Sequence, residues 1–227
     1  MHTFQDPQFG DKVVTLMAAL VLVLQIAMAG QRWIVTNIRI FAAQSFLLAA
    51  MAFTIAWFNH AAHLYVAAGL TLLVKVVLVP ILLERLVERI GIRREIDPIV
   101  NAPLSVLISG GLTLVGYIIA ESFQRPEQAG VAALGHNALA VAISLFLIGF
   151  FMTINRRKAL TQVLALLCLE NGLFLAAISL TYGMPLIVEL GVLFDVLVAV
   201  LVLGILVYRI RETFESMDVS RLRRLRG

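Results

Sequence analysis

Seven long hydrophobic runs constrain this chain more than any other feature of its sequence. Each has about the 20 apolar residues that a helix needs to cross the hydrocarbon core of a bilayer. The runs cover residues 13–30, 38–57, 62–84, 103–121, 136–154, 159–182 and 184–208. Because backbone polar groups in lipid must be paired within their own segment, each run is expected to be a helix. The predicted fold is an all-α, polytopic transmembrane helix bundle of about seven helices.

Basic residues are distributed unevenly between alternate loops, and this asymmetry predicts the orientation of the bundle. With the N-terminus outside, fifteen of the 18 basic residues fall in the inner loops and the C-terminal tail. They are Arg32, Arg39, Arg85, Arg89, Arg93, Arg94, Arg156, Arg157, Lys158, Arg209, Arg211, Arg221, Arg223, Arg224 and Arg226. The outer segments contain only Lys12 and Arg125. Since one missed helix would invert every later loop, the pattern supports the helix count and a cytoplasmic C-terminus. We expect a multi-pass protein of the cell (inner) membrane.

The composition excludes an ordinary soluble domain, because 61% of the 227 residues are hydrophobic and only 14% are charged. The polar, acidic first residues differ from the basic start of a cleavable signal peptide, so the first run is expected to remain as a helix. The basic tail is interpreted either as an anchor at the inner interface or as a docking segment for a cytoplasmic partner. So short a basic patch beside a membrane does not indicate nucleic-acid binding.

Prolines and glycines mark the expected local features of the helices. Pro80 lies inside the third run and predicts a kink. Pro103 and Pro185 fall at helix starts, where a missing N–H costs little. Close helix packing is expected at three glycines of the fourth run, Gly110, Gly111 and Gly116.

Three charged residues, Lys75, Glu170 and Asp195, lie near the centres of predicted helices and at similar depths. A charge at that depth costs about 2.5–3.5 kcal/mol on insertion scales. Glu189 lies roughly 9 Å nearer the outer end of the seventh run than Asp195, at 1.5 Å per residue. One hypothesis is a path for protons or other ions, because buried carboxyl and amine groups can load and release protons. The alternative is static pairing of Lys75 with Glu170 or Asp195.

Neutral polar side chains inside the runs are candidates to link these charges through water. They are Gln44, Asn171 and Tyr182. Signatures of other sites are missing: the histidines lack metal-ligand spacing, and the sequence contains no nucleophile elbow, P-loop or dinucleotide fingerprint. The single cysteine, Cys168, cannot hold an iron–sulfur cluster, which takes about four ligands. We therefore expect no catalytic residues, no cofactor and no metal in this chain.

An internal similarity links "QSFLLAAMAF", which begins at Gln44, with "ENGLFLAAIS", which begins at Glu170. Each segment follows a basic inner loop and precedes a short outer loop. One interpretation is a repeated three-helix unit, and the other is shared hydrophobic composition. The expected organisation is a four-helix N-terminal membrane region, residues 1–130, followed by a three-helix region with a basic cytoplasmic tail, residues 131–227.

The segment "HNALAVAISLFLIGFFMTINRRKALTQVLALLCLENGLFLAAISL" resembles the small K (4L) subunit of respiratory complex I. It has the basic inner loop of that family, and Glu170 matches the family's mid-helix glutamate. The resemblance implies a second carboxyl in the next helix. Asp195 matches that position after a one-residue shift, and Glu189 is the rival match if the helix is gapped. The basic end "RLRRLRG" is also similar.

The whole chain resembles hydrogenase-4 component E more closely, most specifically in "MPLIVELGVLFDVLVAVLVLGILVYRIRETFESMD". This resemblance implies a non-catalytic membrane-arm subunit of a group 4 nickel–iron hydrogenase or formate hydrogenlyase-type complex. Antiporter-like proton-channel subunits would be its neighbours, and the nickel–iron centre and iron–sulfur clusters would lie in partner subunits.

In such a complex the mid-membrane residues would contribute to proton or ion translocation. They are Glu170, Asp195, Lys75, Glu189 and Gln44. The alternative function is a subunit of a cation/proton antiporter or a stand-alone ion transporter.

Overall fold

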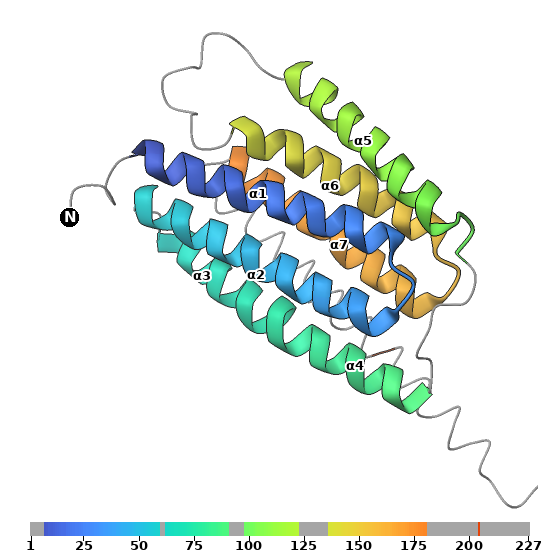
Figure 1. Cartoon of the computed structure of the whole chain (residues 1–227). Helices are drawn as coiled ribbons and strands as arrows, with labels where there is room; N and C mark the ends of the chain where they lie inside the picture. The colour runs from blue at the N-terminus through green and yellow to red at the C-terminus, as the bar shows by residue number, and fades with distance from the viewer. Residues whose placement is uncertain (1–6, 60–61, 91–97, 123–135, 181–203, 205–227) are drawn as a thin grey trace, which may run out of the picture.

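The computed structural model describes residues 7–59, 62–90, 98–122 and 136–180, together with Gly204. Within these ranges all regular secondary structure is helical, as Figure 1 shows. The helices are α1 (Pro7–Gly30), α2 (Ile34–Asn59), α3 (Ala62–Thr71), η2 (Leu72–Leu78), α4 (Val79–Ile90), α5 (Ala102–Ser122), α6 (His136–Asn155) and α7 (Ala159–Leu180). The all-α prediction is confirmed.

The described chain contains 6 segments that are long and apolar enough to cross a membrane. One of them, Leu64–Glu88, combines α3, η2 and α4, and each of the others is a single helix. These segments overlap the first six hydrophobic runs of the sequence. The seventh run, 184–208, lies outside the described residues apart from Gly204. The chain is therefore a multi-pass transmembrane bundle whose helix count is close to seven.

The two N-terminal helices occupy the middle of the bundle. α1 packs against α2, α5 and α6, while α2 packs against α1, α7 and the α3–η2–α4 segment. In Figure 1, α5 lies at one side of the bundle and the α3–η2–α4 segment lies at the other. Side chains from α1, α2, η2 and α7 can therefore meet near the centre.

Two apolar clusters fill the bundle, one toward each end. The first joins the C-terminal halves of α1 and α6 to the N-terminal halves of α2 and α7 and to α4. The second joins the opposite halves of these helices to α3. Buried polar residues lie between the two clusters, namely Gln25, Gln44, Lys75 and Asn171. The middle of the bundle is thus polar, although both ends of its core are apolar.

Glycines allow α6 and α7 to pack closely. A Cβ atom added at Gly172 would lie 2.6 Å from the backbone N of Phe146, and one at Gly149 would lie 2.7 Å from the backbone N of Leu169. Such distances leave no room for a side chain. The two small residues therefore bring the backbone of α7 against α6, close to the residues of α7 that carry the polar cluster.

The glycines of α5 behave only partly as the sequence predicts. Gly116 faces α6, because a Cβ atom there would lie 2.9 Å from the backbone N of Ser144. At Gly110 and Gly111 nothing lies within 4 Å of an added Cβ atom. Within the described chain, the prediction of close packing is therefore wrong at these two positions. They lie about 120° and 140° around the helix from Gly116, at 100° per residue, and so face away from α6.

The third crossing segment is interrupted by the π-helix η2. The Val79 N–H donates to the carbonyl oxygen of Val74, five residues earlier, which is the pairing of a widened turn. Pro80 follows directly; it has no N–H, and its ring crowds the carbonyl about one turn earlier. A wider turn relieves that crowding. The disturbance predicted at Pro80 therefore takes the form of a π-helical segment, which contains Lys75.

The loops predicted to be cytoplasmic meet at one end of the bundle. The Ile99 and Val100 N–H groups donate to the backbone and side-chain oxygens of Asn155, at 3.2 and 2.7 Å. The Arg156 Nη2 atom donates to the carbonyl oxygen of Met28, at 3.1 Å, where α1 ends. The first, third and fifth loops are therefore neighbours, as alternate crossings of a membrane require. The N-terminus-outside orientation itself stays a prediction.

Candidate functional site: a buried polar cluster

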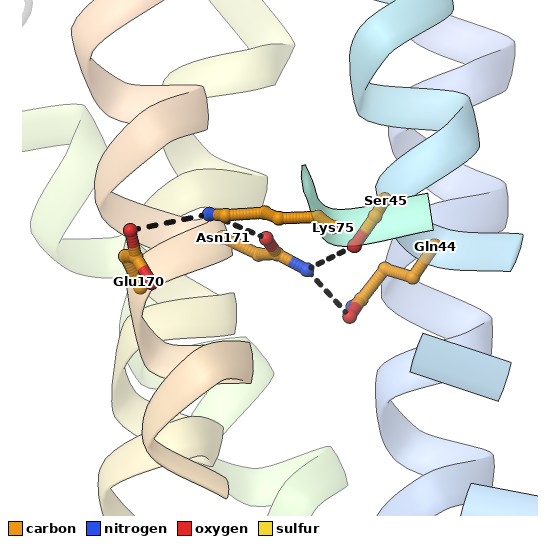
Figure 2. Close-up of polar contacts among 5 residues, drawn as sticks. All are labelled: Gln44, Ser45, Lys75, Glu170 and Asn171. Atoms are coloured by element: carbon orange, nitrogen blue, oxygen red, sulfur yellow. Dashed lines mark hydrogen bonds and ion pairs between the residues drawn. The ribbon is translucent and has the colours of Figure 1, made fainter. Parts of the chain in front are cut away.

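The centre of the candidate site is Lys75 of η2, which is only 1% exposed. Figure 2 shows its side chain extending from η2 toward α7, where Glu170 and Asn171 lie. A buried ammonium group is stable only when other groups replace the water it has lost. The surroundings of this nitrogen therefore determine what the cluster can do.

Within the described chain, Glu170 supplies a negative charge beside Lys75. The Nζ and Oε1 atoms are 3.3 Å apart, and the two side chains are 1% and 4% exposed. The same Nζ donates to Asn171 Oδ1 at 3.2 Å and lies 5.8 Å from the centre of the Phe174 ring. A carboxylate, an amide oxygen and the negative face of an aromatic ring thus surround the ammonium.

A series of buried amides continues from Asn171 toward α2 and α1. The Asn171 Nδ2 atom donates to Gln44 Oε1 at 3.2 Å and to Ser45 Oγ at 3.3 Å. The Gln44 Nε2 atom donates to Gln25 Oε1 at 2.7 Å and to the carbonyl oxygen of Val21 at 3.4 Å. The four polar side chains of this series are fully buried, each 0% exposed.

The series ends on α6, where Gln25 Nε2 donates to the thioether sulfur of Met152 at 3.7 Å. The connected polar groups therefore come from η2, α7, α2, α1 and α6. They cross the bundle at one depth, between the two apolar clusters.

The structure brings three of the predicted site residues into this cluster, namely Lys75, Glu170 and Gln44. Asn171, which the sequence suggested as a link, lies between the charges and Gln44. The other three predicted residues, Glu189, Asp195 and Tyr182, lie outside the described residues. Sequence reasoning left open which carboxylate meets Lys75, and among the described residues Glu170 does so. The sequence suggested links through water, whereas Asn171, Gln44 and Gln25 are joined by direct hydrogen bonds between their side chains.

Two members of the cluster, Gln25 and Ser45, were not predicted. A signal for Gln25 was present, because it is a polar residue inside the first hydrophobic run, as Gln44 is inside the second. Ser45 carried no separate signal, since a serine in a membrane helix can donate to the carbonyl oxygen of its own helix.

The cluster offers acid–base groups and no ligand set for a metal. Within the described ranges no group of three or more His, Cys, Asp or Glu residues could hold a metal ion. The single cysteine of the chain, Cys168, is buried, and its Sγ lies 3.4 Å from the sulfur of Met28. One thiol falls short of the ligands that an iron–sulfur cluster takes, about four.

A second buried cation, Arg156, lies at the end of the bundle where the basic loops meet. It is 3% exposed, and its guanidinium donates to the carbonyl oxygens of Met28, in the last turn of α1, and of Gln31, just beyond that helix. Burial lowers the pKa of Arg156. Its positive charge lies at the negative end of the α1 dipole. This residue closes the helix end and lies apart from the Lys75 cluster.

Comparison with known protein families gives one match to part of the chain. A sequence profile of the family described as NADH-ubiquinone/plastoquinone oxidoreductase chain 4L matches residues 137–227. The matched region includes Glu170 and Asn171 of α7.

Individual relatives cover more of the chain. Hydrogenase-4 component E of Escherichia coli is 24% identical over 218 residues, which are 96% of this chain and 99% of that protein. The protein of the same name from Shigella flexneri has the same identity and coverage. Uncharacterized protein Rv0085 of Mycobacterium tuberculosis is 39% identical over 163 residues, which are 71% of this chain and 72% of that protein. No solved structure matches the chain.

Proposed function

The chain belongs to the hydrogenase-4 component E family, and we propose that it is a non-catalytic membrane-arm subunit of an energy-converting redox complex. This proposal is supported by the match to hydrogenase-4 component E over 96% of the chain, by the chain 4L profile over residues 137–227, and by the six described spans. The proposed neighbours are antiporter-like proton-channel subunits and hydrogenase-type subunits. The proposed location is the cell inner membrane, with lipid around the exposed helix faces.

The observation that carries this proposal is the buried pair of Lys75 and Glu170 inside two membrane-spanning segments. A proton arriving on Glu170 neutralises the carboxylate and releases the ammonium from its partner. The departure of that proton restores the pair. The cluster therefore has two charge states, and a change in electric field from redox events in partner subunits would bias one against the other.

The proposed path extends beyond the described residues to two further carboxyl groups. Asp195 and Glu189 lie in the hydrophobic run 184–208, and both fall inside the region that matches chain 4L. A proton leaving Glu170 would need a next acceptor, and carboxyl groups in the next hydrophobic run can supply one.

The redox centres are proposed to lie in partner subunits. A nickel–iron centre or an iron–sulfur cluster needs several thiolate ligands, about four for a cluster, and this chain has Cys168 alone. The residues of this chain do not fit such a group, and no step of the proposed ion path uses one.

The proposal is tested on the complex purified from native membranes through a tag on this chain. We expect a nickel–iron subunit to co-purify. We expect Glu170→Gln to leave assembly and redox turnover intact, because its amide oxygen can still accept from Lys75 Nζ, but to abolish ion translocation in proteoliposomes. The matched control is Glu121→Gln, at the exposed end of α5. Full translocation by an assembled Glu170→Gln complex would refute the role of the pair.

A second candidate function, ion transport by the chain alone or within a cation/proton antiporter, is favoured by the π-helical segment at Lys75. Transporters often bind ions where a membrane helix is interrupted. Ion flux through liposomes that contain only this chain would support this second function. Flux that requires the co-purified subunits supports the first.

A further inference from the structure

The amide series has a fixed direction, because its two ends permit only one arrangement. Lys75 Nζ can only donate hydrogen bonds, so Asn171 must turn its oxygen toward it. At the far end the Met152 thioether can only accept, so Gln25 must turn its NH₂ group toward the sulfur. Every amide between them must then present oxygen toward Lys75 and NH₂ away from it.

The interior links obey this direction. Gln44 accepts from Asn171 through its oxygen and donates to Gln25 through its nitrogen. The remaining N–H of Gln44 reaches the carbonyl oxygen of Val21, and the second N–H of Asn171 reaches Ser45. All N–H groups of these two amides are therefore used. Rotating either amide by 180° would place donor against donor and acceptor against acceptor. Buried polar atoms would then be left unpaired, which is costly.

Aligned amides act together on the group at their negative end. Hydrogen bonds in a chain polarise one another, so an oxygen at the end of the series is a stronger acceptor than an isolated amide. That oxygen is Asn171 Oδ1, which receives Lys75 Nζ. A lysine side chain has a flexible four-carbon stem, so it needs an external acceptor to fix the position of its ammonium.

We infer that Gln25, Gln44 and Asn171 form a directed amide chain that holds the Lys75 ammonium against Glu170. Gln25 is then a positioning residue, although it touches neither charge. The chain is an anchor, because it ends on a thioether that has no proton to pass on. This inference rests on the proposed function and adds the means by which the pair is held in place.

The test compares two replacements of Gln25 in the assembled complex. Gln25→Met keeps an unbranched side chain but removes the acceptor for Gln44 Nε2. Gln25→Glu keeps that acceptor oxygen. We expect Gln25→Met to lower the number of ions moved per redox turnover by about tenfold, since misplacing a reacting group by about 1 Å can cost up to a hundredfold. We expect Gln25→Glu to stay within about twofold of the wild type, because its carboxyl oxygen still accepts from Gln44 Nε2.

The matched control is Ser144→Ala, which removes a hydrogen bond between α6 and α5 from a fully buried residue that lies outside the chain of amides. It should leave the ion-to-electron ratio unchanged. Equal loss in Gln25→Met and Gln25→Glu would show that Gln25 acts through packing, and would overturn the inference. A wild-type ratio in Gln25→Met, or a ratio above wild type in Gln25→Glu, would also overturn it.

Assembly is measured for every variant. If Gln25→Met does not assemble, the pair Gln44→Met and Gln44→Glu gives the same comparison one link closer to Lys75. Failure of both methionine variants to assemble, with Ser144→Ala intact, would assign the amides to folding and overturn the inference. Full translocation by the Glu170→Gln complex would refute the proposed function, whatever the result for the Gln25 variants. Loss in Glu170→Gln without loss in Gln25→Met refutes the inference alone.

Discussion

At the residue scale, the Lys75 ammonium is held by more groups than the carboxylate of Glu170 alone. Removing two charges from water costs several kcal/mol per ion, and a short contact recovers this only with further hydrogen bonds. Here the ammonium has Asn171 Oδ1 and the face of Phe174 in addition to the carboxylate. Asn171 and Phe174 therefore add to the stabilisation of the buried ammonium.

Removing the ammonium of Lys75 alone should destabilise the protein more than removing both charges. We expect Lys75→Met to lower the free energy of unfolding by about 3–5 kcal/mol, because the buried carboxylate of Glu170 would lose the ammonium that lies 3.3 Å from it. The double variant Lys75→Met, Glu170→Gln should recover most of that loss. Denaturant titration of the purified chain in detergent measures both. Equal destabilisation by the single and double variants would contradict the pairing.

Arg156 should matter for stability and not for ion transfer. Arg156→Met removes the donors to Met28 and Gln31 at the end of α1 and should cost about 1.5–3 kcal/mol, the usual range for bonds to a charged group. The control is Arg157→Met, because the neighbouring Arg157 is exposed. Thermal unfolding in detergent measures the difference, and similar midpoints for the two variants would exclude this role for Arg156.

At the element scale, the π-helix η2 and the glycines of α6 and α7 set the geometry of the cluster. A π-helical turn changes the direction in which the following side chains point, and such turns often occur at functional sites. Lys75 lies inside this turn and points toward α7. The glycines at Gly149 and Gly172 bring α7 close to α6.

Adding a single methyl group at Gly172 should loosen this arrangement. Gly172→Ala places a Cβ atom against the backbone of Phe146, so we expect a loss of about 1–3 kcal/mol through overpacking. Gly111→Ala is the matched control, because its Cβ atom meets open space. Unfolding midpoints of the two variants in detergent provide the comparison. A stable Gly172→Ala protein would show that the α6–α7 contact can shift without cost.

At the scale of the whole molecule, the described parts of the predicted inner loops lie at one end, and apolar side chains are exposed along the spans. α5 is the least buried of the six spans: 17% of its most apolar stretch is buried inside the structure, whereas the corresponding share for α7 is 61%. Its exposed side chains include Leu107, Leu114 and Ile118. Apolar exposure on this scale is stable in lipid, since lipid chains are as apolar as leucine.

The predicted orientation can be tested by labelling single cysteines in a Cys168→Ala background. Glu121→Cys and Arg157→Cys place thiols at exposed positions at opposite ends of the bundle. A membrane-impermeant maleimide should label position 121 in intact cells, and position 157 only after the membrane is opened. The reverse pattern would place the N-terminus inside and contradict the charge-based prediction.

The sequence alone determined the class of the protein and the position of its spans. Hydrophobic length is a local property, and a segment in lipid must pair its own backbone groups, so six predicted helices coincide with the described ones. The mid-membrane position of Lys75 and Glu170 could also be predicted from the sequence, because a single charge is conspicuous in an apolar run. The resemblance of the chain to hydrogenase-4 component E and to the K (4L) subunit of complex I was also visible in its sequence.

Only the tertiary structure decided which side chains meet. The pairing of Lys75 with Glu170, the place of Gln25 at the far end of the amides, and the open space at Gly111 all depend on how each helix is rotated against its neighbours. Moving a residue by one position turns its side chain by about 100°. Rotation is set by packing between segments far apart in the chain, and hydrophobic length within one segment carries no information about it.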